Sequence, residues 1–305
     1  MEVKELSTNL PFGVEVRGIR PADLQSTKTM DELRALWIQH GMIVFRDTDD
    51  DPQFQIELSR CFGPLEAHPV KELRVEGCPE LISIVSRPEE GSILNVEGRT
   101  VANWIPWHSD LTFVEQINRG GLLRVTKPTS WGGQTCFIDQ IEAYNRLPDE
   151  LRERIEGREV LYQLKIMDKT RCALRQNVEL LRPSPSLERL KSRVDTDFPP
   201  VAHPAVYTQK ETGRKVLRIS PMFAEGIVGM DRDEGCALLD EVVDHITSCP
   251  AYYHSWGDNE MILWDNWRML HSVTGAPTDE VRIMRRTTIA GDYGLGRVLG
   301  YEYAM

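Results

Sequence analysis

Short apolar runs rich in β-branched and aromatic residues recur along the chain, and turn residues lie near most of them. These runs occupy residues 42–46, 81–85, 135–138, 160–164, 215–219 and 261–264. Runs of this length between turn residues are typical of β-strands. Helical periodicity is clearest over 30–39, 141–155 and 231–247, and Pro148 starts a fresh turn within the second stretch. The pattern therefore predicts many strands and few, widely spaced helices.

The order of these elements narrows the fold class. Strands do not alternate with helices as in a βαβ repeat, which disfavours a doubly wound parallel sheet and favours a β-sandwich or barrel with helices outside. Residues 166–200 are rich in arginine and proline and contain only scattered large apolar residues. We interpret them as a lid-like insertion in a single domain spanning 1–305. A solvated insertion without a role fits their composition equally well.

Charge and composition exclude several classes of protein. Among 305 residues there are 36 Lys plus Arg against 47 Asp plus Glu, a net charge of −11. This balance disfavours broad binding to nucleic acid or to an anionic membrane. The start has no signal-peptide pattern, and no apolar run is long enough to span a bilayer. We expect a soluble, cytoplasmic protein whose six cysteines, scattered without a C-x-x-C pair, are reduced core thiols.

Two separate segments carry candidate metal ligands. His108 and Asp110 are two residues apart on a segment expected to be extended, so their side chains would point to the same side. Alone this pair is a weak signal, because a histidine beside an aspartate is commonly an ordinary hydrogen-bonded pair. Far along the chain, a strand-like run and a polar turn lead to His271. Two imidazoles and one carboxylate are the facial triad of non-haem Fe(II) oxygenases.

Five other histidines could compete as ligands, although His245 falls on an expected helix and is interpreted as a surface residue. They are His40, His68, His203, His245 and His254.

Three arginines follow His271 in the sequence. In an extended run Arg282 and Arg286 face the same way, whereas Arg285 faces the opposite side. A guanidinium binds a carboxylate in bidentate fashion, so two inward arginines indicate two anions near the metal. Pairing with acidic residues at the surface is the alternative. A non-catalytic metal-binding barrel would have no use for such a pair of arginines. A metal-dependent hydrolase is also disfavoured, because no additional carboxylate that could act as a general base is evident near His108.

The chain resembles the taurine catabolism dioxygenase superfamily, the Fe(II)/2-oxoglutarate-dependent group that includes 2,4-dichlorophenoxyacetate, phenoxypropionate and alkylsulfate dioxygenases. The resemblance covers nearly the whole chain and includes His271 and a series of short motifs in the family order. These motifs are FGVEVRG at 12–18, HGMIVFR at 40–46, CFGPL at 61–65, WHSD at 107–110, GGQT at 132–135, HP at 203–204, ETGRK at 211–215 and WDN at 264–266.

The resemblance implies a double-stranded β-helix core, also called a jelly-roll or cupin-like fold, within a β-rich α+β protein with flanking helices. It also implies Fe(II) as the metal, held by His108, Asp110 and His271, with 2-oxoglutarate as cosubstrate and O2 as oxidant. Thr135 and Arg282 match the partners of the distal 2-oxoglutarate carboxylate, and Arg286 falls where the family binds the acidic group of the primary substrate. Dimers or tetramers are common among relatives, so a homo-oligomer is expected.

Departures from the family pattern bear on the substrate. His68 matches a histidine that lines the taurine pocket, but Lys71 stands where taurine enzymes have tyrosine and Trp104 where they have asparagine. Phe223 aligns with a pocket phenylalanine, whereas Ser220 replaces the usual asparagine. The exchange of an asparagine amide for the Trp104 indole suits a substrate with an apolar or aromatic body. We therefore expect hydroxylation, with or without cleavage, of a small organic acid of this kind; a biosynthetic hydroxylase or desaturase is the alternative.

Overall fold

The computed structural model describes residues 1–67, 74–75, 77–165, 172–191 and 197–300. Its largest sheet has the strand order β1-β2-β3-β19-β10-β21-β6-β5, with β4 paired to β21. All neighbouring strands in it are antiparallel except the parallel pair β2 and β3. The strands are β1 (Glu2–Glu5), β2 (Val14–Arg17), β3 (Met42–Arg46), β4 (Leu65–Glu66), β5 (Arg74–Val75), β6 (Cys78–Ser86), β10 (Gly120–Lys127), β19 (Met261–Asp265) and β21 (Arg282–Ile289).

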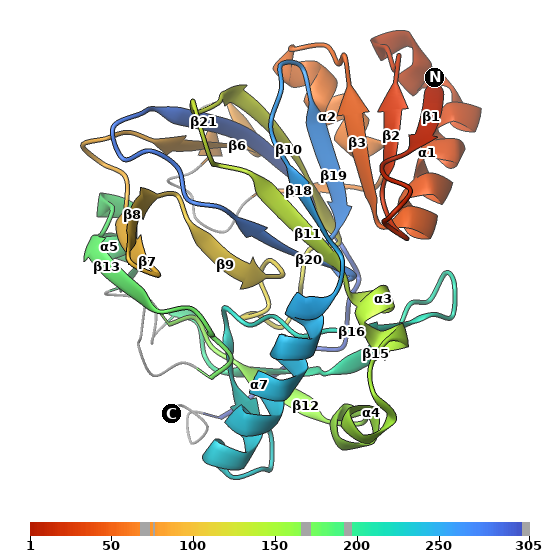
Figure 1. Cartoon of the computed structure of the whole chain (residues 1–305). Helices are drawn as coiled ribbons and strands as arrows, with labels where there is room; N and C mark the ends of the chain where they lie inside the picture. The colour runs from red at the N-terminus through yellow and green to blue at the C-terminus, as the bar shows by residue number, and fades with distance from the viewer. Residues whose placement is uncertain (68–73, 76, 166–171, 192–196, 301–305) are drawn as a thin grey trace.

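A second antiparallel sheet, ordered β18-β11-β20-β9, packs against the first (Figure 1). Its strands are β9 (Ile105–His108), β11 (Thr135–Asp139), β18 (Ala251–His254) and β20 (Met269–Val273). Phe137 of β11 and Trp264 of β19 come from different sheets, and their ring centroids lie 6.1 Å apart. Both belong to a buried cluster that also contains Val125, Met269 and Met284. Apolar side chains from the two sheets therefore form one core, as the predicted sandwich requires.

Smaller sheets extend this core. One has the order β17-β12-β14-β22, another β13-β7-β8, and β15 pairs with β16. Their strands are β7 (Ile93–Val96), β8 (Arg99–Ala102), β12 (Glu159–Tyr162), β13 (Val178–Arg182), β14 (Val201–Pro204), β15 (Val206–Thr208), β16 (Lys215–Leu217), β17 (Ala224–Ile227) and β22 (Arg297–Val298).

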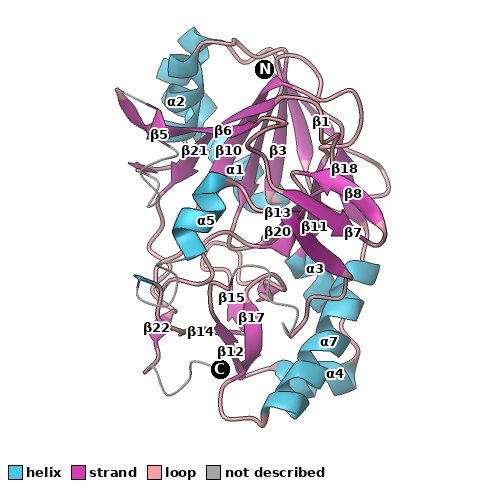
Figure 2. Ribbon diagram, turned by 90° about the vertical axis from the view of Figure 1, so that its left-hand side faces the viewer, coloured by secondary structure: helices cyan, strands magenta, loops and turns pink. Residues whose placement is uncertain are grey.

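Helices cover the sheets from outside. They are η1 (Pro21–Gln25), α1 (Thr27–His40), α2 (Pro52–Arg60), α3 (Gln140–Asn145), α4 (Asp149–Ile155), α5 (Pro185–Lys191) and α7 (Arg232–Ser248). Trp37 of α1 and Phe54 of α2 pack on apolar residues of the large sheet, whereas α3, α4 and α7 share another cluster with β12, β14 and β17. Figure 2 shows α2 and α7 at opposite ends of the molecule. In the described part of the chain, no helix is long and apolar enough to cross a membrane.

A glycine turns the chain from α1 into the core. Gly41 follows α1 with φ of 75° and its N–H bonds the carbonyl of Trp37. A Cβ at this position would lie 2.9 Å from Arg268 Nε and 2.9 Å from Met269 Sδ. Glycine is therefore required here both by the left-handed backbone and by the close approach of the β19–β20 turn.

The predicted elements are confirmed with shifted ends. The strands expected over 42–46, 81–85, 135–138 and 261–264 are β3, part of β6, β11 and β19, and the three helical stretches are α1, the pair α3 and α4, and α7. Strands β12 and β16 end two residues before the predicted boundaries. The apolar run continues past the end of each strand into buried residues that are not part of a sheet. Tertiary packing, and not the local sequence pattern, therefore decides where these two strands end. Pro148 separates α3 from α4 as expected.

The predicted lid-like insertion stays a prediction. Residues 166–171 and 192–196 lie outside the described residues, and between them β13 pairs with β7 and α5 follows.

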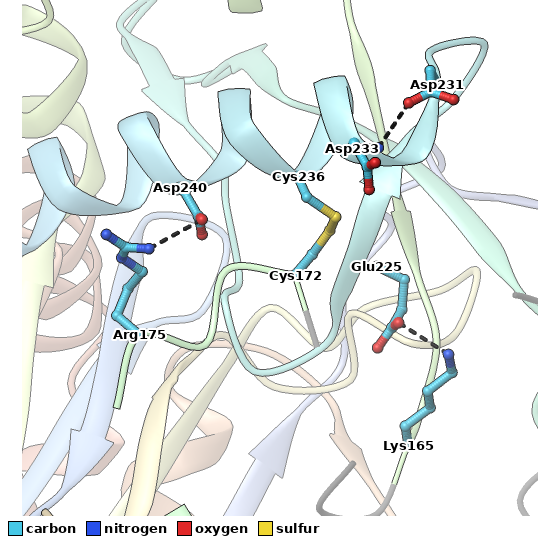
Figure 3. The surroundings of a disulfide bond; sticks show 8 residues. All are labelled: Lys165, Cys172, Arg175, Glu225, Asp231, Asp233, Cys236 and Asp240. Carbon is cyan, nitrogen blue, oxygen red and sulfur yellow. Dashed lines mark hydrogen bonds and ion pairs between the residues drawn. A yellow bond between two sulfur atoms is a disulfide. The ribbon is translucent and has the colours of Figure 1, made fainter. Parts of the chain in front are cut away.

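The predicted cysteine chemistry needs correction. The expectation that all six cysteines are reduced is wrong for two of them. Cys172 and Cys236 form a disulfide with Cα atoms 5.0 Å apart (Figure 3), which the wide sequence separation did not suggest. Arg175 next to it also bonds Asp240 and Asp244 of α7.

A buried ion pair ties the second sheet to the helical layer. Arg268 and Asp139 are only 1% and 2% exposed, and the guanidinium donates to both carboxylate oxygens at 2.8 and 2.6 Å. Asp139 also caps α3 by accepting the N–H of Ile141. The pair therefore fixes where β11 ends and α3 begins.

We expect Asp139→Ala to lower the free energy of unfolding by about 3–5 kcal/mol, because it leaves the Arg268 charge buried without its partner. Urea unfolding measures this change. The exposed pair Arg154 and Glu241 supplies the control, since Arg154→Ala should cost at most about 1 kcal/mol. Equal losses in the two variants would contradict the structural role of the buried pair.

Candidate metal centre

The three predicted metal ligands come together where β9 and β20 pair. His271 lies directly opposite His108 in the register of these strands, and the two ring centroids are 4.1 Å apart. The Nε2 atoms of His108 and His271 lie 3.8 and 3.6 Å from Asp110 Oδ1. Ligand atoms of all three side chains fall within 4.8 Å of one another. Among the described residues no fourth His, Cys, Asp or Glu joins this cluster.

Asp110 reaches the cluster through a turn and not through the expected extended segment. Strand β9 ends at His108, and Leu111 has φ of 55°, a left-handed value that is unfavourable for leucine. The amide of Asn266 holds this turn, because its Oδ1 accepts the Asp110 N–H at 2.7 Å and its Nδ2 donates to the Asp110 carbonyl at 3.0 Å. His108 and Asp110 thus come together as the i and i+2 spacing predicts, but Asp110 lies in a turn and not in an extended segment.

A hydrogen bond orients the His108 ring toward the cluster, and burial keeps this ring neutral. His108 Nδ1 lies 2.8 Å from the carbonyl of Pro106, so donation there leaves the Nε2 lone pair facing the cluster. Burial, followed by the neighbouring His271, lowers the pKa of His108 to about 3, so this ring is neutral at pH 7. A neutral imidazole is the form that binds a metal.

Arg286 lies beside the carboxylate of the cluster. Its Nη1 and Nη2 donate to Asp110 Oδ1 and Oδ2 at 3.2 and 2.6 Å, and its Cζ lies 5.1 Å from the Trp264 ring centroid. Burial acts to raise the pKa of Asp110, but Arg286 and the two imidazoles outweigh it and hold that pKa well below its usual range. The carboxylate is therefore anionic and available as a ligand.

Arg282 borders a second polar space, and Thr135 contacts one of the residues that line it. Arg282 lines a cavity of about 410 Å³ together with Gly133 and Trp256, and it donates to the Gly133 carbonyl at 3.0 Å. The Trp256 indole donates to Thr135 Oγ1 at 3.1 Å. Burial lowers the pKa of Arg282 to about 10, which leaves it charged at pH 7, and no carboxylate in the described part of the chain pairs with it. The predicted orientation is confirmed, because Arg285 points elsewhere and bonds Asp50.

The remaining predicted contacts divide into three cases. Phe223 is 5% exposed and its ring centroid lies 6.2 Å from that of His108, so it forms part of the wall of the site. Trp104 is half-buried in the turn before β9 and forms no ring pair or hydrogen bond with the cluster in the described region. His68 lies outside the described residues.

The competing histidines have other partners. His203 Nε2 lies 3.0 Å from the Val114 carbonyl, and His254 Nδ1 lies 3.0 Å from the Tyr252 hydroxyl. His245 is half-buried and not fully at the surface as expected, since its Nε2 lies 2.8 Å from the Ala143 carbonyl on α3. His40 is the last residue of α1.

Sequence reasoning missed two residues that position the cluster. Asn266 was noted only as part of a family motif, yet both ends of its amide bond the Asp110 backbone. Ser220 was treated as a loss of asparagine, but its Oγ accepts the Ser109 N–H at 3.0 Å. A polar residue directly after a buried strand, as Asn266 follows β19, is the signal that identifies such a role.

This donor set fits a divalent transition metal. Two imidazole nitrogens and one carboxylate oxygen on one side leave further coordination positions to non-protein ligands. Arg286, and Arg282 in its own cavity, provide positive charge for anionic ligands.

Comparisons with known proteins agree with this geometry. The family model described as taurine catabolism dioxygenase TauD, TfdA family matches residues 2–288. The chain is 30% identical over 288 residues to the (S)-phenoxypropionate/alpha-ketoglutarate-dioxygenase of Sphingobium herbicidovorans, with 92% of each chain covered. It is 31% identical over 291 residues to the alpha-ketoglutarate-dependent 2,4-dichlorophenoxyacetate dioxygenase of Cupriavidus pinatubonensis, with 92% of this chain and 94% of that protein covered.

A solved structure has the same fold. The structure of AAD-2 in complex with Mn(II) and N-oxalylglycine matches with a TM-score of 0.72 at 24% identity, and the match covers 96% of this chain and 98% of that chain.

We expect the purified chain to bind one Mn(II) per molecule, and Asp110→Ala to weaken that affinity by at least tenfold, because one of three ligands is lost. Equilibrium dialysis measures the stoichiometry and affinity. His254→Ala is the matched control, since it removes a buried histidine outside the cluster. Unchanged affinity in the Asp110 variant would contradict the ligand assignment.

Proposed function

Because the chain belongs to the taurine catabolism dioxygenase TauD/TfdA family and is a 2-oxoglutarate-dependent dioxygenase, we propose that it uses Fe(II) to hydroxylate a small organic acid with an apolar or aromatic body. The convergence of His108, Asp110 and His271 at the β9–β20 pair carries this proposal. Release of succinate and CO2 accompanies the reaction. Hydroxylation beside a heteroatom leads to cleavage of the substrate.

The metal is proposed to be ferrous iron, bound by these three side chains. When bound, it supplies the redox chemistry that couples decarboxylation of 2-oxoglutarate to oxidation of the substrate by O2. Burial keeps the His108 ring neutral, and the Arg286 charge keeps the Asp110 carboxylate deprotonated. The Pro106 carbonyl orients the His108 ring by accepting a hydrogen bond from its Nδ1. The Asn266 amide keeps the Asp110 turn in place.

The two inward arginines are proposed to bind different anions. Arg282, desolvated and without a carboxylate partner in the described region, would pair with the distal carboxylate of 2-oxoglutarate, and the Thr135 hydroxyl would donate to the same group. Arg286 would bind the acidic group of the primary substrate. Since Arg286 already touches Asp110, an acid bound to it would lie next to the metal. This proximity would place the nearest substrate carbon in position for oxidation.

The proposed substrate has an apolar body because apolar rings border the cluster. Phe223 lies at the edge of His108, and Phe113 packs on Phe223 with ring centroids 5.0 Å apart. Phenoxypropionate and 2,4-dichlorophenoxyacetate, which the names of two relatives give as their substrates, are acids with an aromatic body. We include Trp104 and His68 among the proposed pocket residues on the family pattern alone.

We further propose that residues 1–305 form one catalytic domain. Strands β9, β20 and β21 come from separate parts of the chain and all supply groups to one cluster.

The proposal is tested by substrate-dependent succinate release under anaerobic reconstitution with iron followed by exposure to O2. A screen should include aryloxy acids, alkyl carboxylates, sulfate esters and sulfonates, and we expect the aryloxy or alkyl acids to give the largest release. Failure of every acid to increase succinate above the substrate-free rate would contradict the proposed substrate class.

His108→Ala should abolish iron-dependent succinate formation while the circular dichroism spectrum stays unchanged, because the removed ring is a metal ligand. The matched control is His245→Ala on α7, which should retain activity. Turnover by the His108 variant at a rate near wild type would refute its role.

Arg282→Ala should raise the KM for 2-oxoglutarate, whereas Arg286→Ala should raise the KM for the primary substrate. Each loss of a charged contact in a desolvated site costs about 2–5 kcal/mol. Steady-state kinetics with each compound varied in turn separates the two effects, and Arg285→Ala, on the opposite face of β21, is the control. A reversed pattern would show that the two roles are exchanged.

A further inference from the structure

A buried arginine outside the metal centre has no carboxylate partner among the described residues. Arg218 follows β16 and is 1% exposed. Its guanidinium Cζ lies 4.7 Å from the centroid of the Tyr293 ring. Its guanidinium nitrogens have no hydrogen-bond partner of good geometry within 3.5 Å, although the Tyr293 hydroxyl interacts with the group, and no ion pair among the described residues includes it. This environment is unusual, because buried charges are normally paired.

The positive charge of Arg218 cannot be removed by deprotonation, because a guanidinium keeps its proton under all ordinary conditions. A buried carboxylate of this region, Asp265, accepts hydrogen bonds from Arg119 Nη2 at 2.9 Å and from the Trp267 N–H at 3.0 Å. Asp265 is therefore already balanced by another arginine. A counter-ion for Arg218 has to come from outside the described part of the protein.

Neutral hydrogen-bond donors surround the same guanidinium. The hydroxyls of Tyr207 and Tyr293 are both buried without a hydrogen-bond partner of good geometry, and their ring centroids lie 6.1 Å apart. Burial raises the pKa of both hydroxyls, so they are protonated at neutral pH. His203, with its ring centroid 5.5 Å from that of Tyr293, has an Nδ1 that also lacks a partner. One fixed cation and two O–H donors without acceptors form an environment suited to an anion.

A cavity lies beside the two tyrosines. It measures about 260 Å³, and both Tyr207 and Tyr293 line it together with the apolar side chains Val206 and Leu295. Lys210 also lines this cavity and is exposed, with its ammonium 3.5 Å from Asp292 Oδ2.

We propose that Arg218, Tyr207 and Tyr293 bind one small monovalent anion of the halide class, separate from the metal centre. The anion balances the single Arg218 charge and accepts hydrogen bonds from the two hydroxyls. It stabilises the packing of the 290–296 segment against β15 and β16, since Tyr293 and Tyr207 come from these two parts of the chain. Its binding does not depend on iron, 2-oxoglutarate or turnover.

The test compares the thermal midpoint of the metal-free protein in potassium chloride and in potassium gluconate at equal ionic strength. We expect a midpoint higher by a few degrees in chloride, which grows with chloride concentration as ligand linkage requires. A crystal soaked in bromide should show an anomalous peak within hydrogen-bond distance of Arg218. The proposal is overturned if the midpoints coincide or if only water occupies that position.

Three variants isolate the site. Arg218→Met should abolish the difference between chloride and gluconate, whereas Arg154→Met, which removes an exposed arginine, should retain it. Tyr293→Phe should increase the chloride concentration needed for half the shift, because one donor is lost but the charge remains. If Arg218→Met does not fold, the Tyr293 variant and the bromide peak still test the proposal. An unchanged chloride response in Tyr293→Phe would count against the site.

Discussion

The register between β9 and β20 is the constraint on which the site depends. Directly opposite residues of an antiparallel pair have Cβ atoms about 4.5–5.5 Å apart, so the pairing of His271 with His108 brings two imidazoles to one point without any contribution from a loop. A shift by one residue would turn His271 to the other face of its sheet. Phe137 and Trp264, which pack against the His271 ring, hold that face toward the interior.

Strand β21 supplies the arginines that lie near the paired histidines. Its alternation places Arg282 and Arg286 on the inner side of the large sheet and Arg285 on the outer side. The inner positions differ in their surroundings, since Arg286 pairs with Asp110 whereas Arg282, among the described residues, bonds a backbone carbonyl and no carboxylate. Two similar side chains four residues apart therefore present different affinities for anions. Such a difference gives the protein a means to distinguish two acidic ligands.

The sequence predicted the elements and the residue types of the site better than their geometry. Periodicity located β3, β11, β19 and the main helices, because local hydrophobic pattern and final packing agree there. It could not reveal that Asp110 sits in a turn held by Asn266, since that contact joins segments far apart in the chain. The Cys172–Cys236 bond and the isolation of Arg218 were equally hidden, because both depend on distances that only the folded chain defines. The family pattern supplied roles where spacing alone left several histidines possible.

The disulfide closes a covalent ring from Cys172 to Cys236 that contains α5 and the strands β13 to β17. A protease that cut one peptide bond anywhere inside this ring would yield two polypeptides still joined through sulfur. On a denaturing gel the nicked molecule would migrate as a single band until a thiol was added. Intact mass without reductant would then report only the gain of one water, so damage to this part of the molecule would pass unnoticed in many routine assays.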